Sequence, residues 1–118
     1  MSNKPTIELR NLTRDTVLAA RCRIADSYLP RLIGLMGAPG LEPGEGLLIR
    51  PCNSIHTHFM RFPIDVLYVS HEDKVVAIDE AMAPWRFGRI HRNARYVVEL
   101  PAGTVAATGT LVGDTVTG

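Results

Sequence analysis

Apolar and polar side chains alternate most regularly between Thr16 and Ala25. Apolar residues occupy every second position there, and Arg21 and Arg23 lie in the opposite phase. Such period-two alternation is typical of a half-buried strand, so we predict a strand over Thr16–Ala25 with both arginines facing solvent. A shorter strand is predicted at residues 6–10, after a loose tail at residues 1–5.

Five later segments also have strand character. Residues 46–50 form a short apolar run after a loop rich in glycine and proline, and residues 95–100 are β-branched and aromatic. Between them we predict a meander of three strands at residues 54–59, 64–70 and 74–79, with short turns joining neighbours.

One short helix is predicted near residues 27–36, with Asp26 or Ser27 as its N-cap. The C-terminal tail is expected to hold one helical turn and a final short strand at residues 115–117. Many short strands at close spacing favour a mainly β sandwich or barrel of antiparallel strands. We expect a single domain over residues 6–117.

The composition matches that of an ordinary globular protein, with 46% apolar and 21% charged residues in a chain of 118. The formal net charge is only +1, so we expect neither a nucleic-acid partner nor membrane insertion. Because the sequence has no apolar stretch of membrane-spanning length and no secretion signal, we expect a cytoplasmic location, or export if a signal has been trimmed. Cys22 and Cys52 lack the spacing of a zinc or redox pair, and we treat both as free, partly buried thiols.

The densest group of reactive side chains lies between Cys52 and Asp65. On the predicted strand between them, His56 and His58 would project from one face, and antiparallel pairing would place Asp65 opposite His58. Two imidazoles and a carboxylate form a ligand set for catalytic zinc or iron. The favoured alternative is structural, with Asp65 hydrogen-bonded to Arg61 or His58. Nucleophilic catalysis by Cys52 is disfavoured, because no feature of the sequence indicates an activated thiol.

Arginines and aromatic residues are interleaved in a second group, at residues 85–95, which contains no acid. Its members include Trp85, Arg86, Arg89 and Arg95. Such side chains can clamp a phosphate, a carboxylate or single-stranded nucleic acid by charge and stacking. The favoured alternative is a solvated loop whose arginines pair with acids elsewhere, such as Asp79, Glu80 and Glu99.

Glu99 is the single acid in an otherwise apolar predicted strand. Alternation places its side chain on the same face as Val97 and on the opposite face from Val98. The carboxylate is suited to acid–base chemistry or to an ion pair with Arg95 or Arg61, and the ion pair is favoured.

Several motifs together resemble the family known as domain of unknown function 192, over about residues 7 to 117. The motifs are Gly34-Leu-Met-Gly37, Gly44-Glu-Gly-Leu-Leu48, His56-Thr-x-Phe-Met-Arg-Phe-Pro-Ile-Asp65, Ala94-Arg-Tyr-Val-Val-Glu-Leu-Pro-Ala-Gly103 and Gly113-Asp114. The resemblance implies a small, bacterial-type β-sandwich of jelly-roll type with one short helix, and it assigns no activity. His58 stands where an aromatic residue is usual in the family, which argues against a shared metal site. The matching residues expected to line any common site are His56, Arg61, Asp65, Arg95 and Glu99.

We therefore predict a non-catalytic binding module for a small anionic ligand or a protein segment, without metal or other cofactor. Its candidate ligand-binding residues are His56, Arg61, Asp65, Trp85, Arg86, Arg89, Arg95 and Glu99. The first alternative is a metal-dependent hydrolase built on His56, His58 and Asp65. The second is a structural component of a larger assembly. The oligomeric state is left open.

Overall fold

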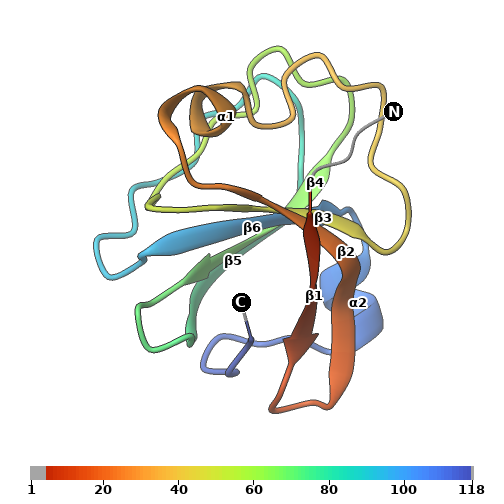
Figure 1. The fold of residues 1–118 in the computed structure, drawn as a ribbon, viewed down its shortest axis with the longest axis vertical. Coiled ribbons are helices and arrows are strands. Elements are labelled where there is room, and N and C mark those ends of the chain that lie inside the picture. Colours follow the sequence, from red (N-terminus) through yellow and green to blue (C-terminus); the bar gives the residue numbers. More distant parts are fainter. Residues whose placement is uncertain (1–4, 118) are drawn as a thin grey trace.

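The computed structural model describes residues 5–117, which form six strands and two short helices (Figure 1). The strands are β1 (Thr6–Asn11), β2 (Thr16–Ala25), β3 (Glu45–Ile49), β4 (Ile64–Val69), β5 (Val75–Met82) and β6 (Tyr96–Pro101). The helices are α1 (Tyr28–Ile33), which follows Ser27 as N-cap, and α2 (Thr104–Thr108). Except for Pro5, the predicted loose tail lies outside the described residues. In the described part of the chain, no helix is long and apolar enough to cross a membrane.

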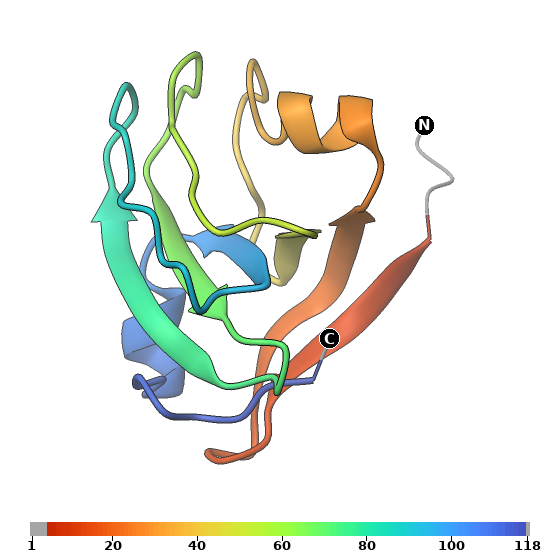
Figure 2. The ribbon, with the colours of Figure 1, turned by 90° about the vertical axis from the view of Figure 1, so that its left-hand side faces the viewer.

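All six strands belong to one mixed sheet with the order β1-β2-β3-β6-β4-β5. β2 and β3 are parallel, because α1 and the following glycine-rich loop carry the chain back along β2, and β3 begins opposite Arg21. The other neighbouring strands are antiparallel. Figure 2 shows that the sheet is strongly curled.

The prediction of a mainly β fold with a short helix near residues 27–36 is confirmed. The jelly-roll-like sandwich or barrel of antiparallel strands is not confirmed. One sheet includes every strand of the described chain, one of its strand pairs is parallel, and its outer strands β1 and β5 are not paired with each other.

The predicted strand at residues 54–59 is wrong. This segment is a loop that makes one isolated bridge, between His56 and Phe87. Its buried residue Thr57 bonds through its backbone to the loop after β5 instead of to a neighbouring strand, and Phe59 has a φ of 64°, which turns the chain. The predicted three-strand meander is therefore reduced to the antiparallel pair β4–β5.

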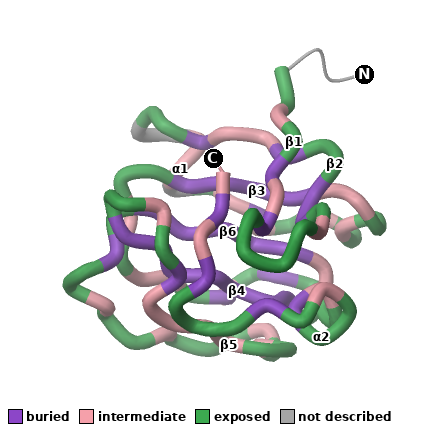
Figure 3. The backbone as a smooth tube through the Cα atoms, turned by 90° about the horizontal axis from the view of Figure 1, so that it is seen from below, coloured by how far each residue is buried: buried purple, intermediate pink, exposed green. Residues whose placement is uncertain are grey.

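Two hydrophobic clusters cover the two faces of the sheet, and β6 contributes to both. Val98 belongs to the cluster that also contains Leu9, whereas Val97 belongs to the cluster that also contains Tyr68. The alternation predicted for residues 95–100 is thus confirmed. Figure 3 shows that the central strands are buried along their length, while the connecting loops are largely exposed.

Asp65 of β4 is 1% exposed and is held by backbone N–H groups. One carboxylate oxygen accepts hydrogen bonds from Gly103 (3.1 Å) and Val105 (2.9 Å) at the start of α2, and the other accepts one from Ala81 (2.8 Å). The prediction that Asp65 takes a hydrogen-bonding partner is confirmed, but the predicted partners, Arg61 and His58, are wrong. Asp65 therefore connects β4 to the end of β5 and to the start of α2.

The C-terminal segment, residues 113–117, joins the two outer strands of the sheet. It bridges Asn11 of β1 through Val116 and Lys74, just before β5, through Thr115. Backbone hydrogen bonds reinforce both contacts, from Leu12 to Thr115 and from Val75 to Asp114, each within 2.9 Å. The final strand predicted at residues 115–117 is reduced to these bridges. We call this segment the C-terminal strap.

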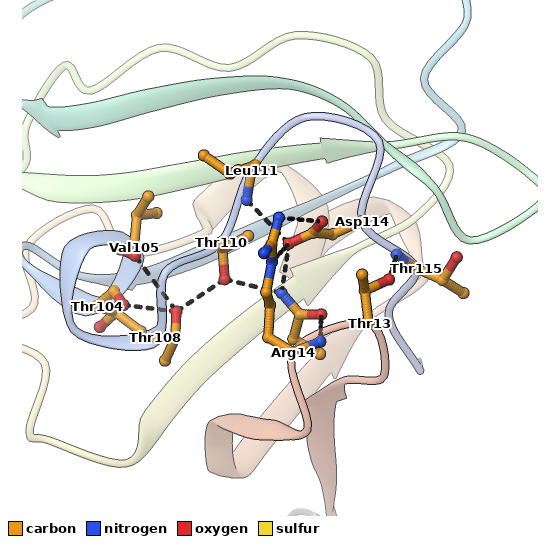
Figure 4. A network of polar contacts seen from close by, with 10 residues as sticks. Thr13, Arg14, Thr104, Val105, Thr108, Thr110, Leu111, Asp114 and Thr115 are labelled. Atoms are coloured by element: carbon orange, nitrogen blue, oxygen red, sulfur yellow. Dashed lines mark hydrogen bonds and ion pairs between the residues drawn. The ribbon is translucent and has the colours of Figure 1, made fainter.

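A buried polar network around Asp114 anchors the C-terminal strap (Figure 4). One oxygen of Asp114 accepts hydrogen bonds from the side chains of Asn11 (2.9 Å) and Arg14 (3.0 Å) and from the backbone of Leu111 (3.0 Å). Burial alone would raise the pKa of Asp114, but the bonds from Arg14 and Asn11 outweigh burial and lower it to about 2. The network therefore holds the strap to the β1–β2 turn.

Candidate functional site

Two loops lie together at the end of the molecule that also carries α1 (Figure 2). One loop precedes β4 and the other follows β5, and Thr57 connects them. The Thr57 backbone donates to the carbonyl of Arg86 (2.8 Å) and accepts from the N–H of Trp85 (2.9 Å). Its hydroxyl donates to the carbonyl of Ala83 (2.6 Å) and accepts from the N–H of Arg86 (2.8 Å). Thr57 therefore fixes the second loop at four points.

Gly88 allows the same two loops to approach each other closely. Its N–H donates to the carbonyl of Ile55 at 2.8 Å. A Cβ at this position would lie 2.9 Å from that oxygen and 2.9 Å from the hydroxyl of Tyr68, which is closer than carbon and oxygen tolerate. Neither Thr57 nor Gly88 was among the predicted site residues. For Gly88, the sequence offered one signal: a glycine between two large side chains can indicate that another backbone segment approaches closely.

The paired loops present four rings, which we call the aromatic patch: His58, Phe59, Trp85 and Phe87. Ring centroids are 4.4 Å apart for His58 and Phe87, 4.9 Å for Phe59 and Trp85, and 5.5 Å for His58 and Trp85. Phe59, Trp85 and Phe87 are 62%, 57% and 81% exposed. These aromatic side chains thus contact one another while most of their surface faces solvent.

Two residues of the aromatic patch have left-handed backbone conformations. Phe59 has a φ of 64° and Trp85 a φ of 63°. For a bulky side chain this conformation costs on the order of 1–2 kcal/mol, and it persists only where the surrounding contacts enforce it. The hydrogen bonds of Thr57 enforce it at Trp85, and a bond from Gly37 to the Phe59 carbonyl (2.9 Å) holds the other loop. The exposed positions of the rings are therefore pre-formed.

Five exposed arginines follow the rings closely in sequence, and we call them the loop arginines: Arg61, Arg86, Arg89, Arg92 and Arg95. The expectation that these arginines pair with Asp79, Glu80 or Glu99 is wrong. Ion pairs within the described residues involve Arg10, Arg14 and Arg50, and none involves a loop arginine. Asp79 instead accepts a hydrogen bond from Tyr68 at 2.8 Å. The loop arginines are therefore available to an external anion.

The predicted convergence of His56, His58 and Asp65 is wrong. The two imidazoles do lie close together, with ring centroids 5.3 Å apart, and His56 Nδ1 accepts a hydrogen bond from the His58 backbone. Asp65, however, is occupied by the N–H groups of α2 and β5. Residues 5–117 contain no cluster of three or more histidine, cysteine or acidic side chains suited to a metal ion. The ligand set on which the metal-dependent hydrolase was based is therefore not assembled.

Glu99 lies apart from the loop arginines, at a small cavity beneath α1. It is 3% exposed, and its predicted ion pair with Arg95 or Arg61 is wrong, since no ion pair of Glu99 occurs among the described residues. Burial raises the pKa of Glu99 to about 7. Among the predicted site residues, His56 also lines this cavity, so the structure brings Glu99 and His56 together.

Cys52 lines the same cavity, and its thiol is not activated. Burial raises the pKa of Cys52, and the thiol donates to the carbonyl of Ser54 at 3.0 Å. A protonated thiol is a poor nucleophile, so the geometry does not support cysteine catalysis. Cys22 and Cys52 are both free, as predicted. Arg95 borders a separate shallow depression next to Cys52.

A family model, that of domain of unknown function 192, described as "Uncharacterized ACR", matches residues 10–118. A "UPF0127 protein" of Pyrococcus furiosus is 34% identical over 110 residues, covering 88% of this chain and 91% of that protein. One of Thermococcus sibiricus is 33% identical over 110 residues, covering 90% of this chain and 71% of that protein. These two relatives are archaeal and do not support the expected bacterial type.

Among solved structures, a protein of unknown function from Novosphingobium aromaticivorans is similar, with a TM-score of 0.86 and 21% identity. The similarity covers 100% of this chain and 89% of that chain. At this identity the likeness shows a shared fold and carries no information about activity.

Proposed function

The chain belongs to the family of domain of unknown function 192, and from this premise we propose that it is a non-catalytic binding protein whose aromatic patch and loop arginines recognise an acidic segment of a partner protein. Membership of the family assigns no activity, so the proposal rests on the properties of this surface. One observation carries it: exposed rings in an enforced backbone conformation are followed closely in sequence by exposed arginines that have no acidic partner in residues 5–117.

The chemistry of the surface favours a protein partner. Tryptophan, other aromatic residues and arginine are enriched where protein interfaces contribute most of their binding energy. Because Thr57 already holds the loops, binding would order few further groups, and pre-organisation of this kind strengthens affinity. Arginine also matches carboxylates in bidentate geometry, which favours aspartate- and glutamate-containing segments. A net charge of +1 argues against nucleic acid, whose binding depends mainly on phosphate neutralisation.

Selection from a phage-displayed library of random peptides tests the proposal with a defined probe. We expect the selected peptides to be enriched in Asp and Glu together with an apolar residue, and their affinity to fall as salt rises from 50 to 500 mM, since charge pairs at an exposed surface are screened. The double variant Arg86→Glu/Arg89→Glu should weaken binding at least tenfold.

A matched control is Arg21→Glu, which reverses the charge of another exposed arginine, on β2. It should bind the selected peptides like the wild-type protein. Selection of neutral or basic peptides, or equal weakening by the control variant, would contradict the proposal. Tighter binding of single-stranded oligonucleotides than of any peptide would point to a nucleic-acid partner and would contradict it as well.

A further inference from the structure

A small cavity lies between α1, the end of β3, the loop at residues 52–60 and β6. Its volume is about 90 Å³. Since one water molecule occupies about 30 Å³ of liquid, the cavity has room for a few non-hydrogen atoms. Its apolar wall includes Ile49 and Met60, and its polar wall includes Arg31, Cys52, His56 and Glu99.

Two residues that line the cavity each have one buried polar atom without a hydrogen-bond partner among the described residues. One is Oε1 of Glu99, and the other is Nε of Arg31. An unpaired buried polar atom is rare in native proteins and costs on the order of 1–3 kcal/mol. Two further polar side chains line the cavity: the Cys52 thiol already donates to the carbonyl of Ser54, and Nδ1 of His56 already accepts from the His58 backbone. The cavity therefore combines one unused acceptor and one unused donor.

We propose that this cavity is a binding site for a compact neutral group that carries both a hydrogen-bond donor and an acceptor, of which a primary carboxamide is the simplest. The amide N–H₂ donates to Oε1 of Glu99, and the amide carbonyl accepts from Nε of Arg31. The small apolar remainder of the ligand contacts Met60 and its neighbours. Above the Glu99 pKa of about 7, an amide satisfies both orphaned atoms and adds no charge to a site that then holds a carboxylate and a guanidinium.

Charged groups of the same size fit the cavity less well. An acetate ion can accept from Arg31 but brings a second carboxylate beside Glu99. A methylammonium ion can donate to Glu99 but offers no acceptor to Arg31 and is repelled by its charge. Like charges at short range in a poorly solvated site are strongly unfavourable. Selectivity for the neutral amide over both ions is therefore the distinguishing property of the site.

The test is a titration of the ¹⁵N-labelled protein with acetamide, acetate or methylammonium at pH 8 and matched ionic strength, followed by amide chemical shifts. We expect saturable shifts with acetamide alone, centred on Ile55, Met60 and Glu99, with a Kd on the order of 1–100 mM, as suits a ligand of so few atoms. Glu99→Leu, which removes the acceptor in an apolar surrounding, should weaken acetamide binding at least tenfold. Glu80→Leu, which removes an exposed acid on β5, should leave it unchanged.

Absence of saturable shifts in the wild-type protein would overturn the proposal and leave the cavity as a water site. Equal binding by wild type and Glu99→Leu, or preference for either ion, would also overturn it. The selected acidic peptides contact other residues, and their affinity for Glu99→Leu reports on the aromatic surface separately. The two proposals can therefore fail independently.

Discussion

Removal of the Thr57 hydroxyl is the most direct perturbation of the aromatic surface. In Thr57→Val, the carbonyl of Ala83 and the N–H of Arg86 lose partners at 2.6 and 2.8 Å, while side-chain volume is nearly preserved. Thr57 is 0% exposed, so water cannot easily replace the hydroxyl. Two such lost hydrogen bonds correspond to about 2–4 kcal/mol of unfolding free energy. For a chain of this length, we expect Tm to fall by roughly 8–16 °C.

The control variant is Thr57→Ser, which keeps the hydroxyl and loses one methyl group, at a cost of about 1 kcal/mol. Urea unfolding compares the three proteins. The fluorescence anisotropy of Trp85, the single tryptophan of the chain, reports how firmly the second loop is held. We expect anisotropy to fall in Thr57→Val and not in Thr57→Ser. No loss in Thr57→Val, or a larger loss in Thr57→Ser, would show that packing of the methyl group, and not the hydroxyl, holds the loops.

Three further outcomes follow from the described contacts. Because the pKa of Glu99 is raised from 4.5 to about 7 on folding, the wild-type protein should lose about 3 kcal/mol of stability as pH rises from 4.5 through 7. Glu99→Gln should lack this loss in urea unfolding at pH 5 and pH 8, and identical pH profiles would refute the assignment. Asp65→Ala should destabilise by about 3–6 kcal/mol in the same assay, since three backbone N–H groups lose their acceptor; a loss below about 1 kcal/mol would contradict its role. Gly88→Ala should lower unfolding free energy by about 1–3 kcal/mol through overpacking against Ile55 and Tyr68, and a neutral effect would show that the loops can separate.

Local patterns in the sequence were enough to locate most strands. The alternation over Thr16–Ala25 predicts β2 with the bounds that the structure has. The parallel pairing of β2 with β3 was not predicted, because alternation indicates which face a side chain occupies and not which strand lies beside it. Residues 54–59 also alternate, but Thr57 bonds to a loop that is distant in sequence, and no local pattern reports such a contact.

The candidate site was predictable in composition and not in geometry. The interleaved rings and arginines at residues 85–95 left open either a surface for anions or a solvated loop, and the structure shows that they are exposed. Asp65 was correctly expected to need a hydrogen-bonding partner. Its partners are backbone N–H groups of α2 and β5, and no sequence pattern indicates such bonds. Glu99 was expected to form an ion pair with Arg95 or Arg61. The structure instead leaves one of its oxygens unpaired beside a cavity.

The C-terminal strap affects how long the ends of the two outer strands stay open to pairing with other chains during synthesis. The ends of β1 and β5 nearest the strap have unpaired backbone groups until residues 113–117 bond to them, and unpaired strand edges readily pair with strands of other molecules. Because the strap is C-terminal to both strands, it leaves the ribosome after them. A nascent chain therefore exposes these backbone groups of β1 and β5 until residues 113–117 have been synthesised.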